Sequence, residues 1–99
     1  MKNSIRVIAR IITKPGTGDR VKSVLSDLIE PTRQELGCIS YELLQNSQDS
    51  DELVLLEEWE DRTALDSHTA ASHTQNAEAQ VKEFLKQVPP DVRVYQTIT

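Results

Sequence analysis

The segment of residues 53–73 constrains the fold more than any other part of this chain. It begins with four consecutive aliphatic residues bounded by polar ones, a run that is too short for a free-standing helix and predicts a strand. Asp61 stands where a helix N-cap is expected, and Leu65 and His68, three residues apart, share one face of the helix that follows. The strand ends near Trp59, the sole tryptophan, so the helix returns a histidine toward it, and both side chains could line one cavity.

Hydrophobic periodicity predicts the remaining elements. Apolar runs and alternation indicate strands, and apolar residues at spacings of three and four indicate helices. The strands are expected at residues 5–12, 38–45, 53–60 and 92–98, and the helices at 19–36, 61–70 and from about 72 to 88. Pro31 is expected to kink or divide the first helix and Gly37 to end it, while Pro89 and Pro90 stop the last one.

The same periodicity assigns side chains to faces. The apolar stripe of the first helix is expected to reach Leu36, and Ile39 is expected on the same strand face as Tyr41 and Leu43. In the last helix, the apolar face is expected to consist of Ala77, Val81, Phe84, Leu85 and Val88.

The element order β-α-β-β-α-β predicts an α+β fold. Two βαβ halves of this kind form a ferredoxin-like antiparallel sheet with strand order 4-1-3-2 and both helices on one face. At 99 residues there is room for one core, and no repeat, low-complexity segment or linker indicates a boundary. Residues 1–99 are therefore expected to form a single domain.

Two of the strands carry aliphatic side chains on both faces. In the first strand Val7 and Ile11 alternate with Ile8 and Ile12, and residues 53–56 of the third strand are aliphatic throughout. Helices can cover only one face, and each aliphatic side chain left in water forgoes roughly 1.5–3 kcal/mol of burial free energy. The bare face is therefore expected to pack against the sheet of an identical subunit, which predicts a homodimer.

Charge and composition disfavour several classes of partner. The formal net charge is −5 and the basic residues are scattered, which disfavours nucleic acid and anionic membrane surfaces. A single cysteine, Cys38, cannot form an internal disulfide, and nothing indicates an oxidising compartment. Arg6 and Arg10 interrupt the N-terminal apolar run, which suits neither a signal peptide nor a membrane span, so a cytoplasmic location is expected.

Two motifs carry a family resemblance. They read Glu35-x-Gly37-Cys38-x-x-Tyr41 and Glu57-x-Trp59, the latter followed by Ala64-Leu65 and His68. With them, nearly the whole chain resembles the antibiotic biosynthesis monooxygenase domain family. The resemblance implies a ferredoxin-like subunit that dimerises through its sheet into an α+β barrel, with a small pocket between sheet and helices.

The resemblance also implies a choice among activities. The family includes cofactor-free monooxygenases of quinols and polycyclic phenols, an isomerase of a phosphorylated signalling sugar, and haem-degrading enzymes. The haem-degrading branch resembles this chain least. The first strand lacks the Asn of that branch, His68 stands where its Trp is expected, and Ala77 and Glu78 stand where its His is expected. Haem degradation is therefore not expected.

His68 is the leading candidate for chemistry. A neutral imidazole beside a phenolic O–H could take its proton near neutral pH. The alternative is a buried structural histidine that is hydrogen-bonded to Glu57 or to the backbone. Glu57 shares a strand face with Trp59 and could orient His68 or pair with an arginine of the first strand, because a buried carboxylate needs a partner.

Charge stabilisation is assigned to either of two residues. Arg10 could stabilise an oxyanion or an anionic substrate, or it could pair with Glu57 or Glu58 on the adjacent strand. Tyr41 could donate a hydrogen bond to a bound oxygen, or it could cap the sheet edge.

Three apolar side chains are candidates for binding the substrate. Trp59 could wall the pocket and stack on a flat aromatic substrate, or simply fill the core. Val81 and Phe84 could form the pocket wall, or they could belong to the core as most such residues do.

No metal or cofactor site is expected. His73 follows His68 by five residues, which on a continuous helix turns it by about 140°. No cysteine or further histidine completes a set of ligands. Gly16-Thr17-Gly18 lacks the rest of a phosphate-binding loop, and no Rossmann or flavin motif is present.

The residues and the resemblance together favour a cofactor-independent monooxygenase that acts on a small quinol or phenol with O₂. That chemistry needs a base, a donor for developing charge and a dry cavity, and His68 is assigned as the base. Two alternatives stay open. An isomerase of a small phosphorylated carbonyl compound would need a phosphate site, for which Arg6, Arg10 and Lys14 are the nearby cations. A non-catalytic dimer that binds a small ligand would need no reacting group.

Overall fold

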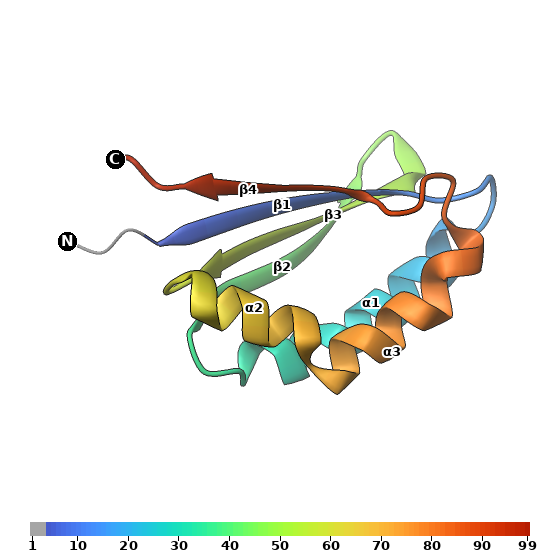
Figure 1. The fold of residues 1–99 in the computed structure, drawn as a ribbon. Coiled ribbons are helices and arrows are strands. Elements are labelled where there is room, and N and C mark those ends of the chain that lie inside the picture. The colour runs from blue at the N-terminus through green and yellow to red at the C-terminus, as the bar shows by residue number, and fades with distance from the viewer. Residues whose placement is uncertain (1–3) are drawn as a thin grey trace.

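The computed structural model describes residues 4–99, which form a four-stranded sheet with all its helices on one face (Figure 1). The strands are β1 (Ile5–Ile12), β2 (Cys38–Asn46), β3 (Asp49–Trp59) and β4 (Asp91–Gln96). The helices are α1 (Gly18–Arg33), α2 (Arg62–Ala70) and α3 (Ser72–Val81), followed by a 3₁₀ turn at Lys82–Phe84. The predicted α+β, ferredoxin-like class is confirmed. Among these residues, no helix has both the length and the apolar character needed to cross a membrane.

The sheet is antiparallel and has the predicted strand order. The order is β2-β3-β1-β4, which is 4-1-3-2 read from the other edge. β1 lies between its two partners, so that Ile8 faces Leu56 of β3 on one side and Arg93 of β4 on the other. Because side chains alternate along a strand, this register places Val7 and Ala9 toward the helices and Ile8 away from them.

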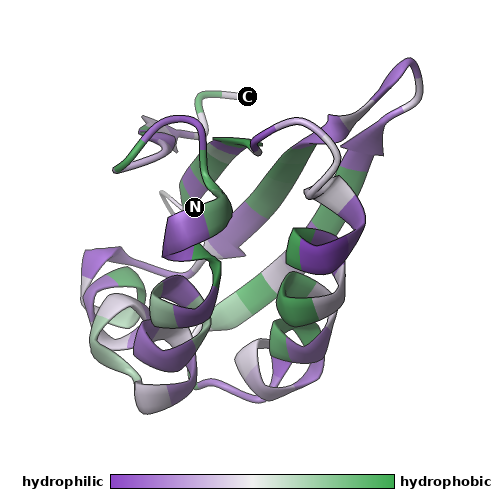
Figure 2. Cartoon of the chain, turned by 90° about the vertical axis from the view of Figure 1, so that its right-hand side faces the viewer, coloured by the Kyte–Doolittle hydropathy of each residue, from purple (hydrophilic) through white to green (hydrophobic). Residues whose placement is uncertain are grey.

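The core lies between the sheet and the helical layer. Hydrophobic and hydrophilic residues alternate along the strands and around the helices, as Figure 2 shows. On the opposite face of the sheet, Ile8 and Leu44 are 40% and 45% exposed, and Val54 and Leu56 are only partly buried. The two-sided apolar character expected for β1 and β3 is therefore present. The buried hydrophobic side chains are Val7, Ala9, Ile11, Val21, Leu25, Leu28, Tyr41, Leu53, Leu55, Trp59, Leu65, Ala77, Val81 and Leu85.

The first helix is not divided at Pro31, contrary to the expectation from the sequence. α1 continues past Pro31 and ends at Arg33, because a proline in the last turn removes only one helical hydrogen bond. Leu36 lies beyond the helix and is 96% exposed, so it does not extend the apolar stripe. Gly37 belongs to the turn that leads into β2, where its φ is +88°.

The last helix is shorter than expected. α3 ends at Val81 and the 3₁₀ turn ends at Phe84, well before the two prolines. Val88, which was expected on the apolar face of this helix, is 52% exposed.

Backbone pairing with the end of β1 explains the early end of that helix. The amide of Lys14 donates to the carbonyl of Phe84 at 2.7 Å, and the amide of Lys86 donates to the carbonyl of Ile12 at 2.8 Å. Leu85 is consequently buried in an extended conformation rather than on a helix.

Three strands also differ from their predicted outlines, and one of them, β3, begins at Asp49 rather than Leu53 because its pairing with β2 extends to Asn46. A β-bulge after Cys38 shifts the register of β2, so Ile39 is half exposed and does not share the buried side of Tyr41. β4 ends at Gln96, and Ile98 beyond it is 89% exposed.

The helical segment after β3 begins and breaks where the sequence predicts. Asp61 caps α2, since its side chain accepts a hydrogen bond from the amide of Ala64 at 2.9 Å. Ala71 has an extended conformation and separates α2 from α3. The chain therefore changes direction between His68 and His73, and this change shapes the candidate site.

Candidate functional site

A cavity of about 450 Å³ lies between the sheet and the helices. Its volume falls in the range typical of small-molecule pockets. Most of its wall is aliphatic and includes Val7, Ala9, Leu25, Leu55, Val81 and Val92. The polar side chains that line it are Tyr41, Glu57, His68, Thr69, Thr74, Glu78 and Lys82.

His68 is the buried histidine of this cavity. It lies in the last turn of α2 and is only 5% exposed. Its ring packs against the indole of Trp59, with centroids 4.7 Å apart and planes tilted by 31°. Tyr41 contacts it edge-on, with centroids 5.4 Å apart. Two aromatic neighbours therefore fix the position of the imidazole.

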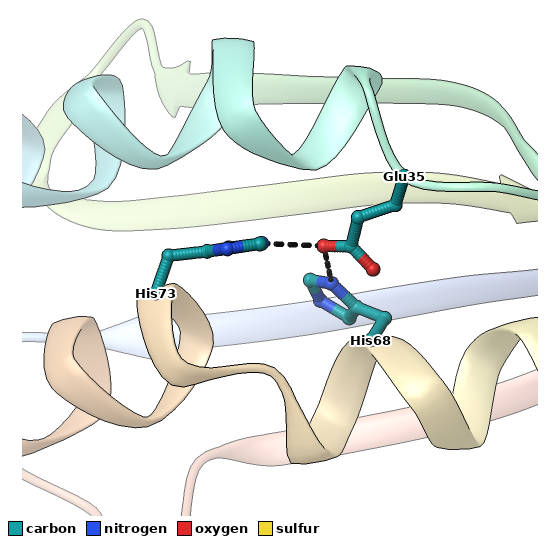
Figure 3. Close-up of side chains that lie close together, drawn as sticks. All are labelled: Glu35, His68 and His73. Atoms are coloured by element: carbon teal, nitrogen blue, oxygen red, sulfur yellow. Dashed lines mark hydrogen bonds and ion pairs between the residues drawn. The ribbon is translucent and has the colours of Figure 1, made fainter.

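The two ring nitrogens of His68 have different surroundings. Nδ1 lies 2.9 Å from Oε2 of Glu35, as Figure 3 shows, and 3.3 Å from the hydroxyl of Thr74. Among residues 4–99, Nε2 has no hydrogen-bond partner. A carboxylate can only accept, so Nδ1 carries the proton in this contact, and in the neutral imidazole Nε2 then has the lone pair that a ligand in the cavity could use.

Glu35 is a site residue that reasoning from single motifs missed. It lies in the turn between α1 and β2, and this turn passes close to α2. A Cβ on Gly37 would come within 2.5 Å of the Cβ of Ala64, so a glycine is required for this approach. The Glu35-x-Gly37 motif contains the signal, because the glycine lets the turn bring the carboxylate to His68.

The position of His73 relative to His68 differs from the one expected. Its Nε2 lies 2.5 Å from the same Oε2 of Glu35 that contacts His68 (Figure 3). The angle of about 140° assumed one continuous helix, but the break at Ala71 turns the start of α3 so that both histidines reach one carboxylate. The expectation that the two histidines point apart was therefore wrong.

Glu57 is buried and bonded to Trp59 rather than to a histidine or an arginine. Its Oε1 accepts a hydrogen bond from Nε1 of Trp59 at 2.9 Å. Burial raises the pKa of its carboxyl above the ordinary value of 4.5, while the Trp59 bond opposes this effect. Glu57 thus makes neither of the two contacts considered for it, and the carboxylate that contacts Nδ1 of His68 is that of Glu35.

Tyr41 lies where a donor to a cavity ligand is needed. Its side chain is 1% exposed and lines the cavity. Burial raises the pKa of its phenol, so the hydroxyl keeps its proton. No residue among those described accepts a hydrogen bond from it, which leaves this hydroxyl available to a ligand.

Of the three apolar candidates, Val81 lines the cavity and the other two do not. Trp59 is fully buried and supports the ring of His68 from behind. Phe84 packs beneath Arg20, whose guanidinium carbon lies 5.1 Å from the ring centroid. Trp59 and Phe84 therefore do not form the aromatic walls that were considered for them, and Tyr41 and His68 are the aromatic side chains among the lining residues.

The position of Arg10 does not suit the role of stabilising charge on a substrate. It is an exposed residue on the bare face of the sheet, and its Nε donates to Glu52 at 2.6 Å. An even-numbered position on β1 cannot face the helices, because Val7, Ala9 and Ile11 already do. Arg10 therefore does not line the cavity.

Comparison with known proteins agrees with this architecture. The profile of the antibiotic biosynthesis monooxygenase family matches residues 4–80. Rv0793 of Mycobacterium tuberculosis, whose name proposes a monooxygenase activity, is 42% identical over 85 residues, covering 86% of this chain and 83% of that protein. YcnE of Bacillus subtilis, named in the same way, is 32% identical and covers 85% and 87% of the two chains.

The solved structures support the same relationship. The structure of Rv0793 superimposes with a TM-score of 0.89 at 38% identity, covering 97% of this chain and 96% of that one. A conserved protein of Methanosarcina mazei superimposes with a TM-score of 0.87 at 31% identity, covering 94% and 91%.

Proposed function

The chain belongs to the antibiotic biosynthesis monooxygenase family, and we propose that it oxygenates a small quinol or phenol in the cavity between sheet and helices. One observation carries this proposal. His68 lines the cavity with Nδ1 held by Glu35, so its Nε2 is the atom left for a substrate hydroxyl. The family and the names of its relatives support the class of reaction, and the geometry supports the base.

The reaction begins with proton transfer from the bound quinol to Nε2 of His68. The electron-rich anion then passes one electron to O₂, and the two radicals combine to form a C–O bond at a ring carbon that carries hydrogen. Loss of water leaves a hydroxyquinone. One quinol and one O₂ give one hydroxyquinone and one water, so the substrate supplies every electron that O₂ accepts.

Glu35 and Tyr41 have distinct tasks in this proposal. Glu35 accepts a hydrogen bond from Nδ1–H and thereby fixes the tautomer of His68 and stabilises the imidazolium that forms. Tyr41, a protonated donor in the same cavity, stabilises negative charge on the substrate oxygen. The aliphatic walls exclude water, which strengthens both interactions.

We further propose that two chains associate through the bare face of the sheet. This face carries Ile8, Leu44, Val54 and Leu56, which remain in contact with water in a single chain. A second sheet packed on these residues would bury them and complete a barrel. The ion pair of Arg10 with Glu52 lies on the same face and is exposed.

The isomerase alternative has less support from the positions of the cations. Arg6 and Arg10 share the bare face of the sheet, and Lys14 does not line the cavity. Within residues 4–99, Lys82 is the one cation among the lining residues. A phosphate group in the cavity would therefore have a single ammonium partner.

Oxygen uptake with a panel of hydroquinones tests the proposal. Val92 lines the cavity and is 52% exposed, whereas Val94 shares its strand face, is 42% exposed and does not line the cavity. Val92→Trp is expected to lower kcat/KM by about tenfold or more, because the indole obstructs the cavity. The matched Val94→Trp variant is expected to retain the wild-type rate.

Two results would contradict this proposal. Equal losses in the two valine variants would place the reaction outside the cavity. Thermal stabilisation by hydroquinones without oxygen uptake would instead favour the non-catalytic, ligand-binding alternative.

A further inference from the structure

The group of Glu35, His68 and His73 has the composition of a metal site. One carboxylate oxygen and one nitrogen from each imidazole all lie within 4.8 Å of one another. Three elements supply them, namely the turn after α1, the end of α2 and the start of α3. The notable feature is convergence, because both imidazoles already contact the same oxygen, Oε2 of Glu35.

We propose that these three side chains bind a divalent transition-metal ion, and specifically Zn²⁺. Two imidazole nitrogens and one carboxylate oxygen form a ligand set that zinc accepts with one further position open. Ligand atoms on a tetrahedral zinc ion are about 3.3 Å apart, given bonds of about 2.0–2.1 Å. The contacts to Glu35 are 2.9 and 2.5 Å, and the two imidazole nitrogens lie within 4.8 Å of each other, so the three side chains would rotate to reach this spacing around an ion.

Exposure of the three side chains supports access for the ion. The side chains of His68 and Glu35 are 7% and 14% exposed, whereas that of His73 is 31% exposed. The ion would enter on the side of His73, and water would fill the open position. Partial burial of the other two ligands would hold the ion more firmly than scattered surface carboxylates do.

The ion would lie outside the substrate cavity. His68 lines that cavity, whereas Glu35 and His73 do not. Zinc bound to Nδ1 would leave the imidazole proton on Nε2, the nitrogen available to the cavity. The metal would thus convert Nε2 from an acceptor into a donor, and a base into a group that cannot take a proton. This second step rests on the proposed function, whereas the metal site itself does not.

Calorimetric titration of chelator-treated, tag-free protein with Zn²⁺ tests the site. Wild type is expected to bind one ion per chain, and both His73→Gln and Glu35→Gln are expected to weaken binding by at least about tenfold. Glu30→Gln, an exposed carboxylate-to-amide change on α1, is the matched control and is expected to leave binding unchanged. Because His73 is partly exposed, its variant retains the fold and decides the test even if Glu35→Gln does not fold.

Absence of zinc binding in wild type, or equal affinity in wild type and His73→Gln, would overturn the site. A second titration addresses the consequence for the base. Zn²⁺ is expected to inhibit oxygen uptake by wild type, and a chelator is expected to reverse this inhibition. The His73→Gln variant is expected to be inhibited only at Zn²⁺ concentrations about tenfold higher or more. Zinc binding without inhibition would retain the metal site and overturn the assignment of Nε2 as the base.

Discussion

At the scale of single residues, the site depends on one carboxylate and one imidazole that are distant in sequence. Glu35 and His68 are 33 positions apart, yet Oε2 and Nδ1 lie 2.9 Å from each other. Glu57 is only two residues from Trp59 and accepts a hydrogen bond from its indole N–H, rather than one from His68. Reasoning from the sequence named Glu57 or the backbone as the possible partner of His68 and gave Glu35 no role, because the contact with Glu35 depends on the course of a turn.

The buried carboxyl of Glu57 yields a prediction about pH. Its pKa is raised in the folded state, so the carboxyl favours folding below the ordinary pKa of 4.5, and this contribution is lost as pH rises through the raised value. Glu57→Gln keeps an oxygen that can accept from Nε1 of Trp59 and removes the buried charge. The free energy of unfolding of the variant, relative to wild type, is therefore expected to be higher at pH 7 than at pH 4.

Urea denaturation at both pH values measures this difference. Glu60→Gln, at an exposed position of the same segment, serves as the control and is expected to show no such pH dependence. A difference between Glu57→Gln and wild type that is the same at pH 4 and pH 7 would contradict the account.

At the scale of elements, the breaks matter as much as the helices. The Asp61 cap and the break near Ala71 are confirmed, because local signals determine them, and the predicted strand order is confirmed because the order of the elements restricts the topology. The predicted end of α3 was wrong by about seven residues, because the helix ends at Val81 rather than near residue 88. Backbone pairing of residues 84–86 with the end of β1 competes with helix formation there, and no local pattern encodes such a long-range contact.

The turn between α1 and β2 gives a prediction at this scale. Gly37→Ala combines a positive φ with a Cβ that would approach Ala64 within 2.5 Å, whereas Gly16 has a φ of +81° and open space around it. Gly16→Ala is expected to cost about 1–2 kcal/mol of unfolding free energy, the price of the left-handed conformation alone. Gly37→Ala is expected to cost more, because the turn must also move away from α2.

Thermal or chemical denaturation of the two glycine variants provides the comparison. The displaced turn should also carry Glu35 away from His68, so Gly37→Ala is expected to lower oxygen uptake while Gly16→Ala retains it. Equal stability of the two variants would show that the close approach to Ala64 contributes nothing.

At the scale of the whole molecule, one chain leaves half of its sheet uncovered. The helices bury one face, and among residues 4–99 no helix or strand crosses the other face in Figure 1. The aliphatic residues of that face could be identified from alternation alone, because β1 and β3 each carry apolar side chains in both directions. The cavity could not be sized from the sequence, since its walls depend on where three helical segments and β4 meet.

The uncovered aliphatic face of the sheet predicts that two chains associate. Wild type is expected to sediment at twice the mass of one chain, and Ile8→Lys is expected to shift it toward the single chain, because a charge would be placed at the centre of the face. Val88→Lys places the same charge on an aliphatic residue that is 52% exposed and lies between the 3₁₀ turn and β4, and it is expected to leave sedimentation unchanged. A wild-type protein that sediments as a single chain at all concentrations would contradict the proposed dimer.

The central claim is that Nε2 of His68 takes the substrate proton, and the rate of oxygen uptake with a reactive hydroquinone tests it most directly. His68→Gln removes the base and is expected to lower kcat by about 100-fold or more. Glu78→Gln alters another polar group that lines the cavity and is expected to keep the wild-type rate. A folded His68→Gln protein with a kcat equal to that of wild type would contradict the claim.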